Sequence, residues 1–281
     1  MSFAFVTTLI EIVSEMLSFT FMVRAIVVGL MVSLCAALLG VNLVLKRYAM
    51  IGTALSHVGF AAMAIAGAVD LAPLTVSMPV VIAAAFLLLR MNESSKVKGD
   101  SAVALLSTSS LAVGIIVISS TTGLTLHVCN VMFGSIFAMT QADMYLSVAL
   151  SVAVIVIFVL FYKQLFAVTY DEDFARATGM KVEVYKSLLA ILTAVTVVLG
   201  MRMMGALLIA SLTLFPALSA MRLCKRFLTV VITSAIIGVV SFFIGMVISF
   251  WHELPPGTSV VAVNLVIFVV FSLTGFVKKA L

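Results

Sequence analysis

Charged side chains are scarce in this chain of 281 residues, because Asp, Glu, Lys and Arg together make up 10% of it, against roughly 25% in an ordinary soluble domain. Apolar residues make up 64%. Even a well-folded soluble domain of this size buries only about 75% of the surface that its chain exposes. The surplus of apolar surface therefore needs lipid as a second solvent. This composition excludes a soluble enzyme, a nucleic-acid-binding protein and a disordered chain.

The chain also has few cysteines and lacks the motifs of hydrolytic enzymes. Cys35, Cys129 and Cys224 are far apart, odd in number and form no CxxC pair, which excludes a disulfide framework. No G-x-x-x-x-G-K-[ST] loop occurs, so we expect no nucleotide hydrolysis by this chain itself. No G-x-S-x-G or H-E-x-x-H motif occurs either, and we expect no enzymatic activity. The apolar runs hold almost no carboxylates, which argues against an ion-driven secondary transporter.

Long apolar runs follow one another with short breaks. A transmembrane helix needs about 20 such residues, and lipid admits only helices or closed barrels. The runs lack the alternating pattern of barrel strands. The sequence therefore predicts an all-α polytopic membrane protein with about eight or nine transmembrane helices, the shortest of which is tilted, broken or merged with its neighbour. The expected spans are 21–45, 50–69, 74–89, 102–120, 143–161, 187–199 (the shortest), 203–221, 228–250 and 260–277.

We expect a single transmembrane domain over residues 1–281, with no soluble domain appended. The first 20 residues contain Glu11 and Glu15 and no Lys or Arg. A signal peptide would begin with positive charge. This segment is therefore predicted to be a short interfacial or packed helix.

The basic residues define an orientation for these spans. Threading nine spans places 14 of the 16 Lys and Arg residues on one side, with Arg24 and Arg202 as the exceptions. Loops rich in Lys and Arg stay in the cytoplasm. The C-terminus is therefore predicted to be cytoplasmic, and the loops that hold Asp70, Asp143 and Glu253 to face outward.

His57 is the one ionisable residue well inside an expected span. It follows Arg47 by ten residues, or roughly 15 Å along a helix, which is about mid-bilayer depth. Thr53 lies one turn earlier on the same face, and Ser56 adjoins. We weigh two interpretations: a ligand for a transition-metal cation, and a packing histidine bonded to a neighbouring carbonyl.

Two outer loops also contain histidine. His127 and Cys129 are two residues apart, and His252 lies in a turn rich in proline and glycine. Two potential ligands without a further cluster are a weak metal signal, and turn chemistry explains the second loop. We expect structural or incidental roles for these residues.

The polar interruption at 162–186 is the longest cytoplasmic piece. Acids precede a short helix-like stretch, 174–178, and Gly179 follows it, as expected for helix caps. It is either an ordinary connecting loop or a docking helix for a cytoplasmic partner. Because the chain has no ATP-hydrolysing motif of its own, the second interpretation implies an external motor.

Several segments together resemble a known family. The stretches LKRYAMIGTALSHVGFAAMAIAG, VMFGSIFAMTQADM, DEDFARATGMKVEVYK with the run that follows it, and LPPGTSVV stand in the family's order and spacing. The chain resembles the membrane permease subunits of zinc, manganese and iron ABC importers over most of its length. The architecture implied is that of metal, siderophore and cobalamin permeases.

The resemblance implies a multi-pass protein of the bacterial inner membrane and no cofactor bound by this chain. It implies a homodimer of permeases, two cytoplasmic ABC ATPases and an extracytoplasmic metal-binding protein, with lipid around them and no nucleic acid. The transported ion would be Zn, Mn or Fe. The second span would line the pathway. The implied ATPase-coupling helix consists of Asp171, Glu172, Asp173, Phe174, Ala175, Arg176, Ala177, Thr178 and Gly179.

One position departs from the family's pattern. Members commonly carry G-D-x-x-x-H in the second span, whereas here Gly52 and His57 match and Thr53 stands in place of the Asp. His57 is therefore the expected metal ligand and Thr53 a weaker one. A site with a hydroxyl in place of a carboxylate should hold hard Mn²⁺ less well and favours an imidazole-tolerant metal such as zinc. Otherwise the substrate differs or the site is degenerate. The alternatives are an ABC permease for an iron chelate or cobalamin, and a stand-alone secondary cation transporter.

Overall fold

The computed structural model describes residues 11–93, 99–121 and 141–280, and these residues form helices joined by short connections. His127 and Cys129 lie outside the described residues, so the expectation of a structural loop there stays a prediction. Residues 11–18 are helical and bury Met16, while Glu11 and Glu15 are exposed. This agrees with the packed-helix interpretation of the first 20 residues.

Nine of the described helices are long and apolar enough to cross a membrane, as predicted. The short run at 187–199 belongs to a complete helix, α10, which also contains residues 182–186 of the predicted cytoplasmic segment. The rest of that segment consists of the helices α8 (Tyr162–Tyr170) and α9 (Glu172–Ala177) and the turn before α10. The nine helices are α2 (Thr20–Leu45), α3 (Ile51–Ala68), α4 (Pro73–Glu93), α5 (Gly99–Thr121), α7 (Gln141–Leu160), α10 (Val182–Met204), α11 (Ala206–Leu223), α12 (Phe227–His252) and α13 (Pro256–Ala280).

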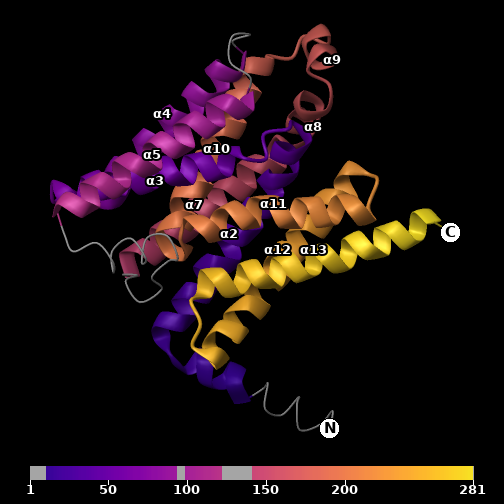
Figure 1. Ribbon diagram of the computed structural model, residues 1–281. Helices are drawn as coiled ribbons and strands as arrows, with labels where there is room; N and C mark the ends of the chain where they lie inside the picture. Colours follow the sequence, from indigo (N-terminus) through magenta and orange to yellow (C-terminus); the bar gives the residue numbers. More distant parts are fainter. Residues whose placement is uncertain (1–10, 94–98, 122–140, 281) are drawn as a thin grey trace.

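The nine helices form an inner and an outer set. The inner helices α2, α3, α10, α11 and α12 bury half or more of their apolar stretch, whereas α4, α5, α7 and α13 bury less than a third. In the bundle, α2 packs against α10, α11 and α12, and α3 packs against α4 and α5 (Figure 1). The outer helices present large apolar side chains such as Leu105, Ile116 and Val159. These surfaces suit a hydrocarbon environment.

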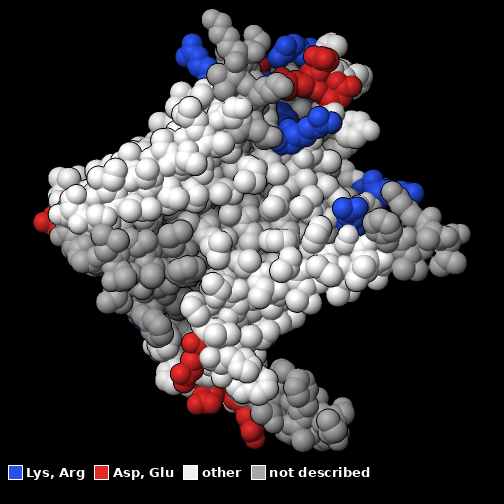
Figure 2. Space-filling view, in the orientation of Figure 1, with Lys and Arg blue, Asp and Glu red and all other residues white. Residues whose placement is uncertain are grey.

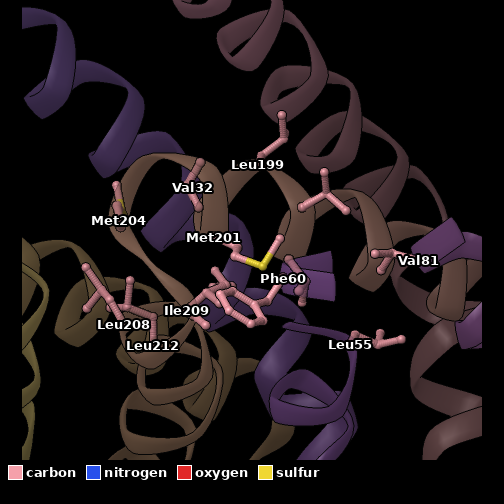
Figure 3. Packing of buried hydrophobic residues seen from close by; sticks show 14 of the residues in the cluster. Val32, Leu55, Phe60, Val81, Leu199, Met201, Met204, Leu208, Ile209 and Leu212 are labelled. Atoms are coloured by element: carbon pink, nitrogen blue, oxygen red, sulfur yellow. The ribbon is translucent and has the colours of Figure 1, made fainter. Parts of the chain in front are cut away.

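The core lies where α2, α3, α10 and α11 meet. Phe60, Met201 and Ile209 come from three different helices and are almost completely buried together (Figure 3). Gly59 makes this packing feasible, because a Cβ there would overlap the end of the Met201 side chain. Gly205 alone separates α10 from α11 and has φ of +86°, a conformation that glycine adopts without steric cost.

Candidate metal pathway and coupling segment

His57 lies on the inner helix α3 and points toward the outer helix α5. Its Nδ1 is 2.7 Å from the Ser107 hydroxyl oxygen of α5. Gly114 of α5 lies against Phe60 and Ala61 of α3. This small residue lets the two helices approach each other closely. The partner of His57 is thus a hydroxyl and not the neighbouring carbonyl of the packing interpretation. The hydroxyl holds Nδ1 and so restricts the orientation of the ring.

The other polar groups near His57 are small. Thr53 is partly buried one turn earlier on α3, and its carbonyl accepts a hydrogen bond of 2.8 Å from the buried Ser56 hydroxyl. Ser56 is therefore occupied by its own helix. Within the described residues no group of three or more His, Cys, Asp and Glu side chains comes together. The described residues of a single copy thus bring one imidazole, and no cluster of metal ligands, to this face of α3.

An ion pair joins two helices at the outer end of the bundle. Arg202, near the end of α10, donates to both carboxylate oxygens of Asp143 at the start of α7, at 2.7 and 2.9 Å. Such a two-point pair is geometrically specific. It neutralises one of the two basic residues that fall outside the cytoplasmic group. The sequence placed both residues near the outer surface, but not their pairing.

The segment predicted to be cytoplasmic has the caps that the sequence predicted. The Asp171 carboxylate accepts a hydrogen bond of 2.9 Å from the Phe174 N–H and so caps α9. Gly179 follows the helix with φ of +82°. Phe174 is 64% exposed on this short helix. A capped helix that presents an aromatic ring to solvent has the form of a docking element.

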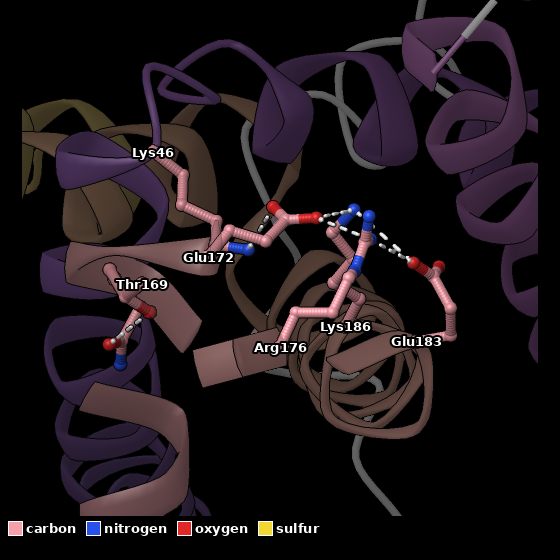
Figure 4. A network of polar contacts seen from close by, with 7 residues as sticks. Lys46, Thr169, Glu172, Arg176, Glu183 and Lys186 are labelled. Atoms are coloured by element: carbon pink, nitrogen blue, oxygen red, sulfur yellow. Dashed lines mark hydrogen bonds and ion pairs between the residues drawn. The ribbon is translucent and has the colours of Figure 1, made fainter. Parts of the chain in front are cut away.

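Glu172 is the centre of a polar network that links α9 to two spans (Figure 4). Its carboxylate lies 3.8 Å from the Lys46 Nζ at the end of α2 and pairs with the Lys186 Nζ of α10. Both lysine side chains are only 8% exposed. Burial lowers the pKa of Lys46, and the Glu172 carboxylate partly offsets this. Sequence reasoning placed Glu172 in the segment but did not foresee this network.

A second polar contact holds the same segment. The Thr169 hydroxyl of α8 donates to the Asn42 side-chain oxygen of α2 at 3.1 Å, and both side chains are buried. Asn42 and Lys46 are one helical turn apart on α2. The α8–α9 segment is therefore attached to α2 at two neighbouring points.

Charge is distributed unequally over the molecular surface. On the face shown in Figure 2, Lys and Arg atoms gather near α8 and α9 and near the turn between α11 and α12. Asp and Glu atoms lie near α9 and also at the opposite end of the molecule, close to the N-terminal helix. The basic end coincides with the predicted cytoplasmic side.

The described architecture agrees with a known transporter family. Residues 18–275 match the ABC 3 transport family. The chain belongs to this family. It is a multi-pass membrane permease subunit and not a catalytic subunit. The predicted relationship to metal-importer permeases is confirmed. Family membership excludes the stand-alone secondary transporter, because members of an ABC family work with an ATPase.

Relatives of known description cover almost the whole chain. The manganese transport system membrane protein MntC of Halalkalibacterium halodurans is 26% identical over 90% of this chain and 87% of that protein. The high-affinity zinc uptake system membrane protein ZnuB of Haemophilus influenzae is 25% identical over 89% and 96%. Among solved structures, PsaBC from Streptococcus pneumoniae in complex with Fab matches with a TM-score of 0.83, 25% identity and coverage of 93% and 94%.

Proposed function

We propose that this chain forms the translocation pathway for a divalent transition-metal ion, zinc in particular, in an ABC importer. The observation that carries the proposal is His57, a histidine on an inner helix whose Nδ1 is held by Ser107. An imidazole with one nitrogen held by a hydrogen bond presents the other as a metal ligand. The relatives named for manganese and zinc transport support a metal cargo. The metal is the cargo of the pathway and not a resident cofactor.

Zinc fits the side chains of this site better than manganese does. Hard Mn²⁺ prefers carboxylate and water oxygens, whereas imidazole suits zinc. Thr53, one turn from His57, offers a hydroxyl where a carboxylate would add a negative charge. We infer that two copies of the permease place two His57 side chains along a shared pathway, because the part of one chain that the structure describes brings a single imidazole to this face.

The remaining components follow from the same assignment. The α8–α9 segment docks on a separate ATPase, with the exposed Phe174 at the contact. An extracytoplasmic metal-binding protein delivers the ion to the outer end of the bundle. ATP binding closes the ATPase pair, and the segment transmits that movement to the spans.

Transport by the reconstituted complex tests the proposal. The permease, its ATPase and its binding protein are placed in liposomes, and ATP-dependent uptake of radioactive Zn²⁺, Mn²⁺ and Fe²⁺ is compared. We expect Zn²⁺ to enter fastest and His57→Ala to reduce its uptake at least tenfold. His252→Ala is the matched control, because His252 is exposed at the end of α12. Equal uptake by His57→Ala and the control would remove His57 from the pathway.

Metal preference is tested at the neighbouring position. Thr53→Asp supplies a carboxylate one turn from His57, so we expect the ratio of Mn²⁺ to Zn²⁺ uptake to rise. Thr53→Val, which is close in size and carries no charge, should leave that ratio near the wild-type value. A ratio that stays unchanged in Thr53→Asp would place Thr53 outside the metal site.

A further inference from the structure

We propose that Glu172 is the positioning residue through which the cytoplasmic segment moves the spans α2 and α10. This rests on the proposed function, in which the α8–α9 segment docks on the ATPase. Most residues of α9 face solvent, and a helix of six residues has little contact area with which to transmit force. Ala175 is buried in a small cluster with Val168 and Val182. Glu172 is the residue of α9 whose carboxylate contacts lysines at the end of α2 and near the start of α10 (Figure 4).

The geometry separates Glu172 from the other charges nearby. Lys46 and Lys186 are nearly buried, so removal of their shared carboxylate would leave two cations without it in a poorly hydrated place. Arg176 and Glu183 are 60% and 62% exposed and pair with each other at 3.1 Å. Arg176 also lies 3.5 Å from the Glu172 carboxylate, and the Glu183 carboxylate lies 3.8 Å from the Lys186 Nζ. Exposed pairs of this kind contribute little. The charged contacts between α9 and the spans therefore centre on Glu172 and the two buried lysines.

Two attachment points on α2 define the orientation of the segment as well as its position. Thr169 binds Asn42, and Glu172 binds Lys46 one turn further along the same helix. Lys186 adds a third point on α10, which is the helix that continues through Gly205 into α11. Displacement of α9 would thus pull on α2 and α10 together. Both helices belong to the inner set, and α3, which carries His57, packs against α10.

The test separates transport from ATP hydrolysis in the complete complex. In liposomes that contain the permease with its ATPase and binding protein, ATP hydrolysis and Zn²⁺ uptake are measured on the same sample. We expect Glu172→Gln to lower the number of ions moved per ATP about tenfold, within the range typical of coupling between sites. Hydrolysis and retention of the ATPase should stay within about twofold of the wild type. Glu183→Gln is the matched control and should keep the wild-type ratio.

A double variant tests whether Glu172 acts through Lys186. Lys186→Met keeps the aliphatic stem and removes the buried charge that Glu172→Gln leaves behind. If the two residues act as a pair, the double variant moves no fewer ions per ATP than Glu172→Gln alone. Effects that multiply would show independent roles and overturn the proposal.

The outcomes distinguish this inference from the function on which it rests. If the wild-type complex moves no metal with ATP, the proposed function fails. If the wild type transports and Glu172→Gln moves as many ions per ATP as Glu183→Gln, only the role of Glu172 fails. Loss of the ATPase from Glu172→Gln, with uptake and hydrolysis falling together, would show a purely structural role and would also overturn the inference.

Discussion

At the scale of single residues, hydrogen bonds and close approaches determine what each side chain can do. His57 was recognisable in the sequence because charge is so rare in the spans. Its partner was not, because Ser107 lies 50 positions away and resembles every other serine of α5. Contact between α3 and α5 is what turns an isolated histidine into one with a fixed ring.

Ser107 provides the first residue-scale prediction. Ser107→Ala removes the hydrogen bond that orients His57, so Zn²⁺ uptake should fall about 10–100-fold, the usual cost of losing a partner of a metal ligand. Uptake by the reconstituted complex measures it. Ser109→Ala is the control, because the Ser109 hydroxyl bonds the Leu105 carbonyl within its own helix. Wild-type uptake by Ser107→Ala would show that the bond does not orient the ligand.

Gly40 provides the second residue-scale prediction. A Cβ at Gly40 would overlap the Thr213 carbonyl oxygen, where α2 and α11 pack closely. Gly40→Ala should therefore destabilise the protein by about 1–3 kcal/mol or more, because the backbone of α11 would have to shift to relieve the overlap. Thermal unfolding in detergent measures the change. In Gly67→Ala no atom lies within 4 Å of the new Cβ, so that variant should be unchanged or more stable by up to about 1 kcal/mol. Equal melting temperatures for the two variants would contradict this reading.

At the scale of elements, caps and local charge explain why the cytoplasmic segment is helical. α9 has six residues, which is too short to be stable alone in water. Asp171 at its start, Gly179 beyond its end and the Glu172 contacts make up for this. The first two were readable from the sequence because capping depends on neighbours in the chain.

Asp171 gives the element-scale prediction. Asp171→Ala removes the cap and should cost α9 about 0.5–2 kcal/mol. Faster amide hydrogen exchange at 172–178, with unchanged exchange in α12, would be the expected result. Asp171→Ser retains a capping oxygen and should exchange nearly as slowly as the wild type. If exchange in α9 were unchanged in Asp171→Ala, the tertiary contacts alone would hold the helix.

At the scale of the whole molecule, the basic residues define how the bundle crosses the membrane. Of the two exceptions, Arg202 is paired with Asp143 at the outer end. The orientation rests on the excess of Lys and Arg on one side, where 14 of the 16 basic residues fall, so a single basic residue on the other side is compatible with it.

Accessibility in intact cells tests this orientation. Cysteine is introduced singly as His252→Cys or Lys225→Cys, both at exposed positions, in a chain whose own three cysteines are replaced. We expect a membrane-impermeant maleimide to label His252→Cys in intact cells and Lys225→Cys only after permeabilisation. The opposite pattern would invert the topology.

The sequence by itself predicted lipid as the solvent, about eight or nine spans and an orientation for them. The structure has nine candidate spans among its described residues, and the orientation stays a prediction. These properties follow from composition and from the order of apolar and basic residues along the chain. The length of each apolar run indicates a span, and the basic residues beside it indicate its orientation. The same holds for the caps of α9. The sequence also indicated the family, because several segments kept the family's order and spacing over most of the chain.

Only the tertiary structure decided which distant residues meet. Ser107 with His57, Asp143 with Arg202, and Glu172 with Lys46 and Lys186 are pairs brought together by helix packing. The sequence of an apolar helix in lipid gives little indication of which face contacts its neighbours, because small residues and shape govern the packing. The polar contacts of His57 and those of Glu172 could therefore be identified only once the helices were in place.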